Sequence, residues 1–500
     1  MGNPVDPTLI DPVTVNVLIV ADGRLRFVKN AARENGDFSL SLLTEALSER
    51  LGPIARFSIT TAFRQPQRHI RSEEEDSIGE GADFKDFHFT DGLRTAFDEV
   101  WFFGDQEETL NPSGTPIIPT TQLLNDEPRI VSEFMDTGGG VFATGDHLSL
   151  GASMSRLLPR VGSMRQWNGI RPGTGRDRND TTSGRLDPSE ETDEVPQTIR
   201  PRFYGREGSR VYPHPLLSGY RGTINVLPDH THEGDCREDQ SEPELREYNG
   251  QQPLIVADSD SHSEAGTPFR AIGGYDGHRV DRGRIVVDSS FRHFIDSNLR
   301  GLSATPAAGP PNTIPRADRG ACAYEDIKTY YRNIATWLAP SAAQAEMFKR
   351  ALWETRWRSR LYALLAPDTG LIDPGQVDPE RDSNLVLSVG SATRDVLERL
   401  TSPAFTLLWS IERFKDGTGG DPDLRLLYPW LRENQRQGSA PSNDSDSERV
   451  VAFILGGVLI KFAIRFPRKP MAAVPNPSAE LDTIVSDGVE FGLIAFRKAQ

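Results

Sequence analysis

The stretch VTVNVLIVA, residues Val13–Ala21, is apolar apart from one threonine and one asparagine, and Asp22 follows it. A Val-rich apolar run of this length is typical of a parallel strand that is buried on both faces. Leucines at helical spacing follow in residues 38–51, and a second candidate strand comes at Ala55–Phe63. The beginning of the chain therefore predicts a strand–helix–strand unit of an α/β fold.

The same alternation continues to about residue 338. Further candidate strands lie at 99–104, 141–144, 223–227, 254–257, 269–272 and 284–287. Candidate helices lie at 121–135, 149–158 and 324–338. Alternation of this kind predicts a doubly wound α/β domain with a mainly parallel sheet over residues 13–338.

Two segments depart from the alternation. Residues 169–200 are polar and nearly free of apolar side chains, which predicts a long insertion loop. Beyond Pro340, apolar residues recur at helical spacing in 342–365 and 384–414. We therefore expect residues 341–500 to form a mostly helical C-terminal region. Its apolar faces need a partner, either the α/β domain or another subunit.

Composition limits the classes of function. The 500 residues include 56 Lys plus Arg against 72 Asp plus Glu, a net charge of −16. Nucleic acid is bound by a basic face, so this balance weighs against a nucleic-acid-binding protein. The only cysteines are Cys236 and Cys322, which excludes a disulfide framework of more than one bridge. The first twelve residues show no signal peptide, so we expect a cytoplasmic protein.

One apolar run, residues 450–464, raises the question of membrane contact. It contains Lys461 and is interrupted by two glycines. At about fifteen residues it is shorter than the ~20 that a membrane-spanning helix needs. We expect a buried core helix or paired strands, and a membrane-contacting effector segment is the alternative.

Acidic residues follow the predicted strands closely. In an open parallel sheet, ligands bind outside the carboxyl ends of the strands. Asp22, Asp105, Asp146 and Asp288 all come at such ends, so we expect them near one edge of the sheet. Because Asp also caps helices and initiates turns, each of them taken alone has an ordinary structural explanation.

The stretch GGGVFATGDHLSLG, residues 138–151, combines a glycine-rich entry, a short strand and a turn into a predicted helix. This is the layout of a nucleophile elbow, in which a strained turn projects one side chain above the sheet. Here the projecting residue is Asp146, with His147 after it, and we expect both at the site. The alternative is that Asp146 caps the following helix.

The stretch DHTHEGDC, which ends at Cys236, holds two histidines that share one face of an extended segment. His230 and His232 beside a carboxylate predict a Zn²⁺ site, because neutral imidazole and carboxylate oxygen both suit this ion. Asp146 or His147 completes the expected ligand set, and Cys236 is a weaker fourth candidate. A histidine-rich polar loop without a metal is the alternative.

The stretch GRIVVDSSFRHF, residues 283–294, brings a strand to Asp288, and His293 follows. A histidine at this point is a candidate general base, ligand or proton shuttle, and Glu233 is a second candidate for the shuttle. The alternative is a capped helix start with a half-exposed histidine.

Together these stretches resemble the class I glutamine amidotransferase-like superfamily, most of all its ThuA-like branch, named for trehalose utilisation. Three stretches of that branch, GGG-strand-His, HP-x-x-x-G and glycine-strand-His, match residues 138–147, 214–219 and 283–293. The resemblance covers roughly residues 13–338 and implies a flavodoxin-like sheet with a site at the elbow. Amidotransferases carry cysteine at the elbow, and Asp146 stands here. Thioester chemistry on glutamine is therefore not expected.

Two functions of different classes follow from these observations. The first is metal-assisted hydrolysis of a small polar substrate, such as a sugar derivative or an amide. Its catalytic residues are Asp146, His147, Glu233 and His293, and its ligands for a divalent metal, expected to be zinc, are His230, His232 and Asp146. The second is a catalytically degenerate module that binds a ligand or partner and assembles, as a homo-oligomer, through its helical C-terminal region.

Overall fold

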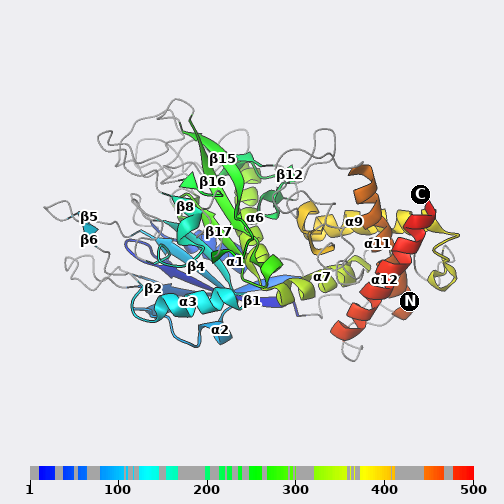
Figure 1. The fold of residues 1–500 in the computed structure, drawn as a ribbon, viewed down its shortest axis with the longest axis horizontal. Coiled ribbons are helices and arrows are strands. Elements are labelled where there is room, and N and C mark those ends of the chain that lie inside the picture. The colour runs from blue at the N-terminus through cyan, green and yellow to red at the C-terminus, as the bar shows by residue number, and fades with distance from the viewer. Residues whose placement is uncertain are drawn as a thin grey trace.

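The computed structural model has a large twisted sheet with helices on both faces, and a group of helices lies beyond one end of it (Figure 1). The structure describes residues 11–28, 38–49, 54–64, 79–105, 109–110, 116–117, 123–145, 154–166, 197–202, 213–219, 222–227, 235–238, 247–261, 267–290, 293–296, 299, 320–356, 361, 365, 372–406, 408–410, 444–466 and 477–499. The predicted insertion at 169–200 therefore lies outside the described residues except for its last four positions.

The core of the sheet is parallel and has the flavodoxin-like strand order β2-β1-β4-β7-β17. These strands are β1 (Val13–Ala21), β2 (Ala55–Phe63), β4 (Glu99–Gly104), β7 (Gly140–Gly145) and β17 (Ile285–Asp288). Every residue of β4 and β7 is buried, because helices cover both faces. Burial on both faces explains why these strands have nearly continuous apolar sequences, and the predicted doubly wound, mainly parallel sheet is confirmed.

Beyond β17 the sheet continues with antiparallel strands. These are β16 (Thr267–Tyr275), β15 (Leu254–Ser261) and the short β10 (Arg200–Pro201), while the two-residue β3 (Phe84–Lys85) closes the other end. The expected strand at 223–227 is wrong as one element. It divides into β12 (Gly222–Thr223) and β13 (Val226–Leu227), which pair outside the main sheet with β11 (Ser218–Gly219) and β9 (Gln197–Thr198).

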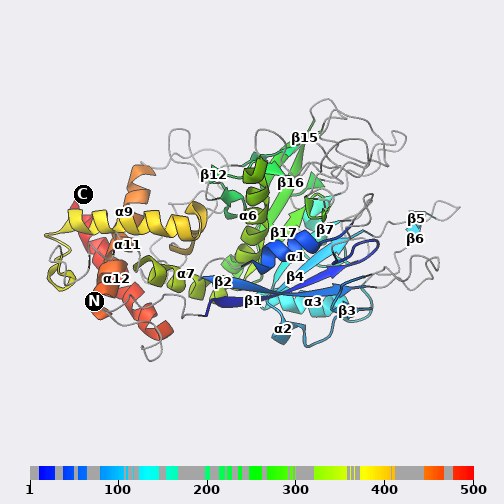
Figure 2. The ribbon, with the colours of Figure 1, turned by 180° about the vertical axis from the view of Figure 1, so that it is seen from behind.

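Helices cover the two faces of the sheet. One face carries α1 (Ser41–Ser48) and α6 (Gly320–Leu338), which lie in front of the sheet in Figure 2. The other carries α2 (Leu93–Ala96) and α3 (Glu127–Asp136), which face the viewer in Figure 1. The expected helix at 149–158 is wrong in its described part, because 154–158 is turn. Pro159 disfavours helical geometry before it, and Arg160 has a φ of 68°.

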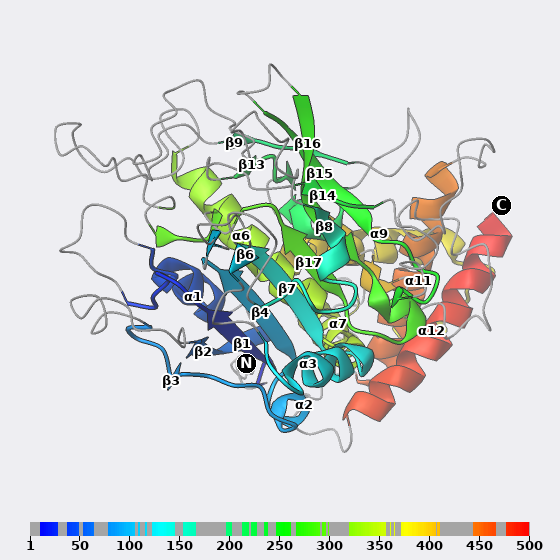
Figure 3. The same ribbon diagram turned by 60° about the vertical axis from the view of Figure 1, so that its left-hand side comes forward.

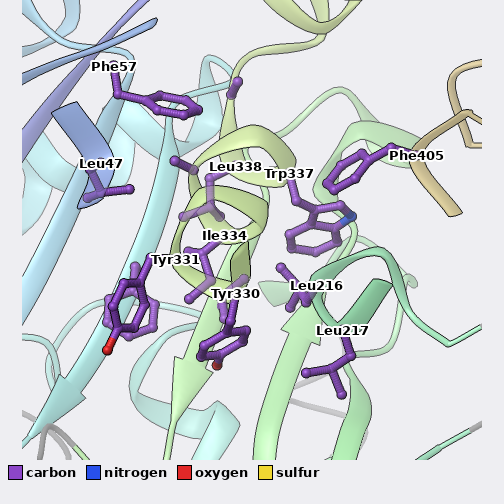
Figure 4. Close-up of a cluster of buried hydrophobic side chains, with 14 of the residues drawn as sticks. Leu47, Phe57, Leu216, Leu217, Tyr330, Tyr331, Ile334, Trp337, Leu338 and Phe405 are labelled. Atoms are coloured by element: carbon purple, nitrogen blue, oxygen red, sulfur yellow. The ribbon is translucent and has the colours of Figure 1, made fainter. Parts of the chain in front are cut away.

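Helix α6 runs antiparallel to the strands it covers. A Cβ on Gly140, at the beginning of β7, would lie 2.3 Å from the Leu338 carbonyl oxygen. About two turns earlier, in the middle of the helix, Tyr330 reaches Asp288 at the end of β17. Between these points Ile334 and its apolar neighbours pack in the cluster shown in Figure 4. One helix therefore connects the two edges of the sheet.

The C-terminal region is helical, as expected. It contains α7 (Ser341–Arg356), α9 (Ser383–Leu400), α11 (Asp444–Arg465) and α12 (Pro477–Ala499), seen from another side in Figure 3. Residues 450–460 of α11 are all buried, so the expected core helix is confirmed. A Cβ on Gly456 would lie 2.0 Å from a carbonyl oxygen of α9, and one on Gly457 2.2 Å from a carbonyl oxygen of α12. The glycine pair thus permits close backbone approach on two sides. Within the described residues, no helix is long and apolar enough to cross a membrane.

The helical region is joined to the sheet by a buried polar network and by one apolar cluster that runs from β1 through α6 to α11 and α12. Fully buried Arg284 donates from Nε to Asp276 Oδ1 at 2.7 Å and from Nη1 to Gln344 Oε1 at 2.9 Å. Its guanidinium carbon lies 4.8 Å from the centre of the Trp337 ring. Trp409 donates its indole N–H to the same Gln344 oxygen at 3.3 Å. The α/β domain is therefore one partner of the apolar helical faces.

Glu99 gives the first testable consequence. It is fully buried at the beginning of β4, where Trp101 donates its indole N–H to Oε2 at 2.8 Å. Burial, the largest effect, and the charge of Asp98 raise the pKa of Glu99 well above its usual value, although the Trp101 bond opposes them. A carboxyl group with a raised pKa stabilises the fold below its unfolded pKa, and this stabilisation is lost as pH rises through the folded pKa.

We predict that Glu99→Gln, which keeps the acceptor for Trp101 but cannot ionise, raises the free energy of unfolding at pH 8 by about 1 kcal/mol or more. The gain should shrink as pH falls towards about 4, where the wild-type carboxyl is protonated in both states. Urea unfolding from pH 4 to 8 measures this. Glu490→Gln, at an exposed position of α12, is the control and should show no such trend. A gain for Glu99→Gln that does not vary with pH contradicts the assignment.

Candidate functional site

The parallel strands bring three of the four predicted aspartates to one edge of the sheet. Asp22 and Asp105 directly follow the neighbouring strands β1 and β4, and Asp288 ends β17. The Asp105 backbone N–H donates to Asp22 Oδ1 at 2.8 Å, so these two are in direct contact. The strand order reverses between β1 and β4, which is the usual ligand position of this fold. Asp146 follows β7 by one residue but lies outside the described residues.

Both carboxylate oxygens of Asp105 accept hydrogen bonds from Arg24, which lies in the loop after β1. The Arg24 backbone N–H and Nε donate to Asp105 Oδ2 at 2.8 and 2.9 Å, and Nη2 donates to Oδ1 at 2.9 Å. Gly23 has a φ of 63°, and a Cβ there would lie 2.8 Å from the same Oδ2. Asp22 and Asp105 therefore fix the loops after two strands, which is the structural role that each aspartate allows by itself.

The first helix after β1 begins at a carboxylate of the protein itself. Leu42 donates its backbone N–H to Asp296 Oδ1 at 2.7 Å, and the Ser41 hydroxyl donates to Oδ2. In nucleotide-binding α/β folds the beginning of this helix binds phosphate. Asp296 is fully buried in that position here, so this helix terminus is already occupied by negative charge.

His293 lies beside Asp288 at the end of β17. Its Nδ1 is 2.9 Å from Asp288 Oδ1, and both side chains are 0% exposed. This contact does not meet the geometric criteria of a hydrogen bond. Two lone pairs facing each other at this distance would repel, so one of the two groups carries a proton there. A histidine whose Nδ1 faces a carboxylate is the arrangement that orients catalytic and metal-binding imidazoles.

Further donors hold this pair, and the sequence alone did not reveal them. Ser290 donates its backbone N–H to Asp288 Oδ1 at 2.9 Å, and the Tyr330 hydroxyl donates to Oδ2 at 2.9 Å. The Tyr331 hydroxyl donates to the backbone carbonyl of His293 at 2.7 Å. Burial, then the adjacent Asp288 carboxylate, raises the pKa of Tyr330 well above its usual value. The tyrosine therefore stays a neutral donor at ordinary pH.

The end of β7 lies next to this pair. The Thr144 hydroxyl donates to the Asp288 carbonyl oxygen at 3.2 Å. Gly145 has a φ of 111°, and a Cβ on it would lie 2.1 Å from the Gly104 carbonyl oxygen. The last residue of β7, where the elbow was expected to begin, therefore requires glycine. The two elbow residues, Asp146 and His147, come next in the chain and lie outside the described residues.

The predicted ligands His230 and His232, together with Glu233, also lie outside the described residues. The residues on either side are described. Leu227 belongs to the apolar cluster on the α6 face of the sheet, and Cys236 to the cluster on the α3 face. The Cys236 thiol is buried, with Sγ 3.5 Å from the Ala271 carbonyl oxygen. Cys236 is therefore a core residue.

The His214 of the HP-x-x-x-G match is not part of this group. Its Nδ1 accepts the Leu216 backbone N–H at 3.3 Å, and its ring packs edge-on against Trp337 at 5.0 Å. Trp337 lies about two turns of α6 beyond Tyr330, at the C-terminal end of the helix. Burial, the largest effect, lowers the pKa of His214 to about 3, so it is a neutral core histidine.

Within the described part of the chain, no group of three or more His, Cys, Asp or Glu side chains is arranged to hold a metal ion. The described carboxylates of the edge already accept hydrogen bonds from the protein. A metal site at this edge therefore depends on the predicted residues of the two segments outside the description.

The comparisons with known proteins add no relative. A scan against models of protein families, a search of curated proteins and a search of solved structures each returned no match. The amidotransferase-like resemblance thus stays a prediction.

The end of β7 yields a prediction with an internal control. Gly138 precedes β7 and Gly145 ends it, with similar φ values of 100° and 111°, but a Cβ on Gly138 meets nothing within 4 Å. Gly138→Ala should lower the free energy of unfolding by about 1 kcal/mol, the cost of the backbone conformation alone. Gly145→Ala should cost about 2 kcal/mol more, because its methyl group meets backbone. Denaturant unfolding measures both. Equal costs would contradict the close approach of Gly145 to the backbone of Gly104.

Proposed function

We propose that this protein is a metal-assisted hydrolase of a small polar substrate, with its site at the carboxyl edge of the sheet beside β7 and β17. One observation carries the proposal: a buried histidine and a buried aspartate in contact, His293 and Asp288, lie next to the end of β7. An oriented imidazole is the group that most often moves protons in hydrolytic enzymes.

In this proposal His293 is the general base and proton shuttle, and Asp288 orients it. With Nδ1 directed to the carboxylate, Nε2 is the nitrogen that accepts a proton. Asp146, His147 and Glu233 belong to the same site, and His230, His232 and Asp146 are the ligands of a divalent metal, expected to be Zn²⁺. Such an ion supplies the nucleophile by lowering the pKa of a bound water.

The described residues that border the two ligand-bearing segments support a common site. Gly145, the residue before Asp146, pairs with Gly104 in the sheet, and Thr144 bonds the Asp288 carbonyl. Asp235, directly after the histidine-containing stretch, accepts the Arg270 backbone N–H at 2.6 Å. Arg270 lies on β16, which is the neighbour of β17. Both segments that carry the proposed ligands therefore connect to strands around Asp288.

We predict that purified protein loaded with Zn²⁺ and desalted retains about one ion per chain, because two imidazoles and a carboxylate form a typical zinc ligand set. The double variant His230→Ala/His232→Ala should lose the ion and keep its circular dichroism spectrum. His88→Ala, at a histidine whose side chain is 56% exposed near α3, is the control and should retain the metal. Elemental analysis measures all three, and wild-type protein without zinc contradicts the metal site.

We also predict that His293→Gln retains zinc but loses hydrolysis, by about 10²-fold or more, because it removes the general base and no ligand. Initial rates on 4-nitrophenyl acetate and on 4-nitrophenyl glycosides measure this, with His88→Ala as the control. Zinc-loaded wild-type protein that hydrolyses none of these probes, nor a panel of amides and sugar esters, would contradict a hydrolase.

The second candidate is a degenerate module that binds a ligand or partner and forms a homo-oligomer through its C-terminal helices. Its support is that Asp22 and Asp105, at the usual ligand position of the fold, are both engaged in fixing loops. The complete burial of His293 also favours it. A purified protein that binds no metal and hydrolyses none of the probes, but is oligomeric by light scattering, would favour this candidate over the hydrolase.

A further inference from the structure

We infer that Tyr330 is the positioning residue that sets the proton arrangement of the Asp288–His293 pair. The inference rests on the proposed role of His293, but the geometry that supports it does not depend on any substrate or metal. It makes helix α6, which leads into the C-terminal region, a part of the site.

The Asp288 carboxylate has two oxygens with different partners. Oδ1 accepts the Ser290 backbone N–H and faces His293 Nδ1, each at 2.9 Å. Oδ2 accepts the Tyr330 hydroxyl at 2.9 Å. A donor on each oxygen thereby holds the orientation of the carboxylate. In this orientation Oδ1 is the oxygen that faces the imidazole.

Tyr330 is itself held in place. Its side chain is fully buried, and its ring centre lies 6.3 Å from that of Phe294 and 6.2 Å from that of Tyr331. Figure 4 shows the two tyrosine hydroxyls on one side of Ile334 and Trp337 on the other. Beside Trp337, at the C-terminal end of α6, Arg284 Nη1 donates to the Trp337 carbonyl oxygen at 3.2 Å. The C-terminal half of the helix cannot slide along the sheet without breaking contacts at both places.

The proton on His293 follows from this geometry. A carboxylate 2.9 Å from Nδ1 favours the tautomer with the proton on Nδ1, which leaves Nε2 as the acceptor. Without the Tyr330 hydroxyl, Oδ2 would be a buried anionic oxygen that has lost this donor, a costly state that favours rotation of the carboxylate. The preference for the Nδ1–H tautomer would then weaken.

Tyr331 provides a matched comparison on the next position of the helix. It is also buried and its hydroxyl also donates to the site, but the acceptor is the His293 backbone carbonyl. Tyr331→Phe removes the same single oxygen from the same core and leaves the carboxylate untouched. A merely structural role of the two hydroxyls would make the two variants equivalent.

The test is ¹⁵N NMR of the full-length protein labelled at histidine, in which the shifts of the two ring nitrogens report the tautomer. His293→Gln assigns the signal, and thermal unfolding checks that each variant is folded. We expect His293 to be mainly the Nδ1–H tautomer in wild-type protein and in Tyr331→Phe. In Tyr330→Phe we expect the Nε2–H tautomer to rise at least about twofold.

Two results overturn the inference. One is a wild-type His293 that rests mainly as the Nε2–H tautomer, which decides the matter even if Tyr330→Phe does not fold. The other is a pair of variants with the same tautomer populations. Neither result concerns zinc or hydrolysis, so failure here is distinct from failure of the proposed function.

Discussion

The Asp288 carboxylate is buried at the end of β17, and the residues and the helix around it are positioned to compensate its burial. A buried charge is costly unless hydrogen bonds and an opposite charge or proton compensate it. The compensation comes from a backbone N–H two residues later, from His293, and from Tyr330 on a helix that begins more than thirty residues further along the chain. The position of α6 and the orientation of the histidine therefore depend on the same carboxylate.

A second buried charge lies at the C-terminal end of α6. Asp276 is buried, and burial alone would raise its pKa, but Arg284 and Arg279 outweigh this and lower the pKa to about 2. The pair thus stays ionised at neutral pH, and its stabilising effect is lost only as pH falls through the folded pKa. Arg284 also bonds Gln344 of α7, so the same interaction joins the helical region to the sheet. Polar contacts hold α6 at its middle and at its C-terminal end, and apolar packing fills the space between them.

The strands of the parallel core could be predicted from sequence, and three of the predicted ranges, among them β1 and β4, match those of the structure. They could be found because burial on both faces leaves a continuous apolar run. The antiparallel direction of β15 and β16 could not be predicted, because the sequence of a strand does not determine which strand it pairs with. Tyr330 was missed because a tyrosine on an apolar helix face has the pattern of a core residue. Three of the four edge aspartates, Asp22, Asp105 and Asp288, lie where they were predicted. Their partners, such as Arg24, depend on contacts between distant parts of the chain.

A crystal structure of wild-type protein grown with Zn²⁺, with anomalous scattering measured at the zinc edge, tests the central claim most directly. The account predicts one strong peak at the carboxyl edge of the sheet near the ends of β7 and β17. Two imidazole nitrogens, those of His230 and His232, should lie at about 2.0–2.1 Å from it. His293 should remain against Asp288 without binding the ion. Ordered density for residues 228–234 with no peak beside it, or a peak bound only at the protein surface, would contradict the account.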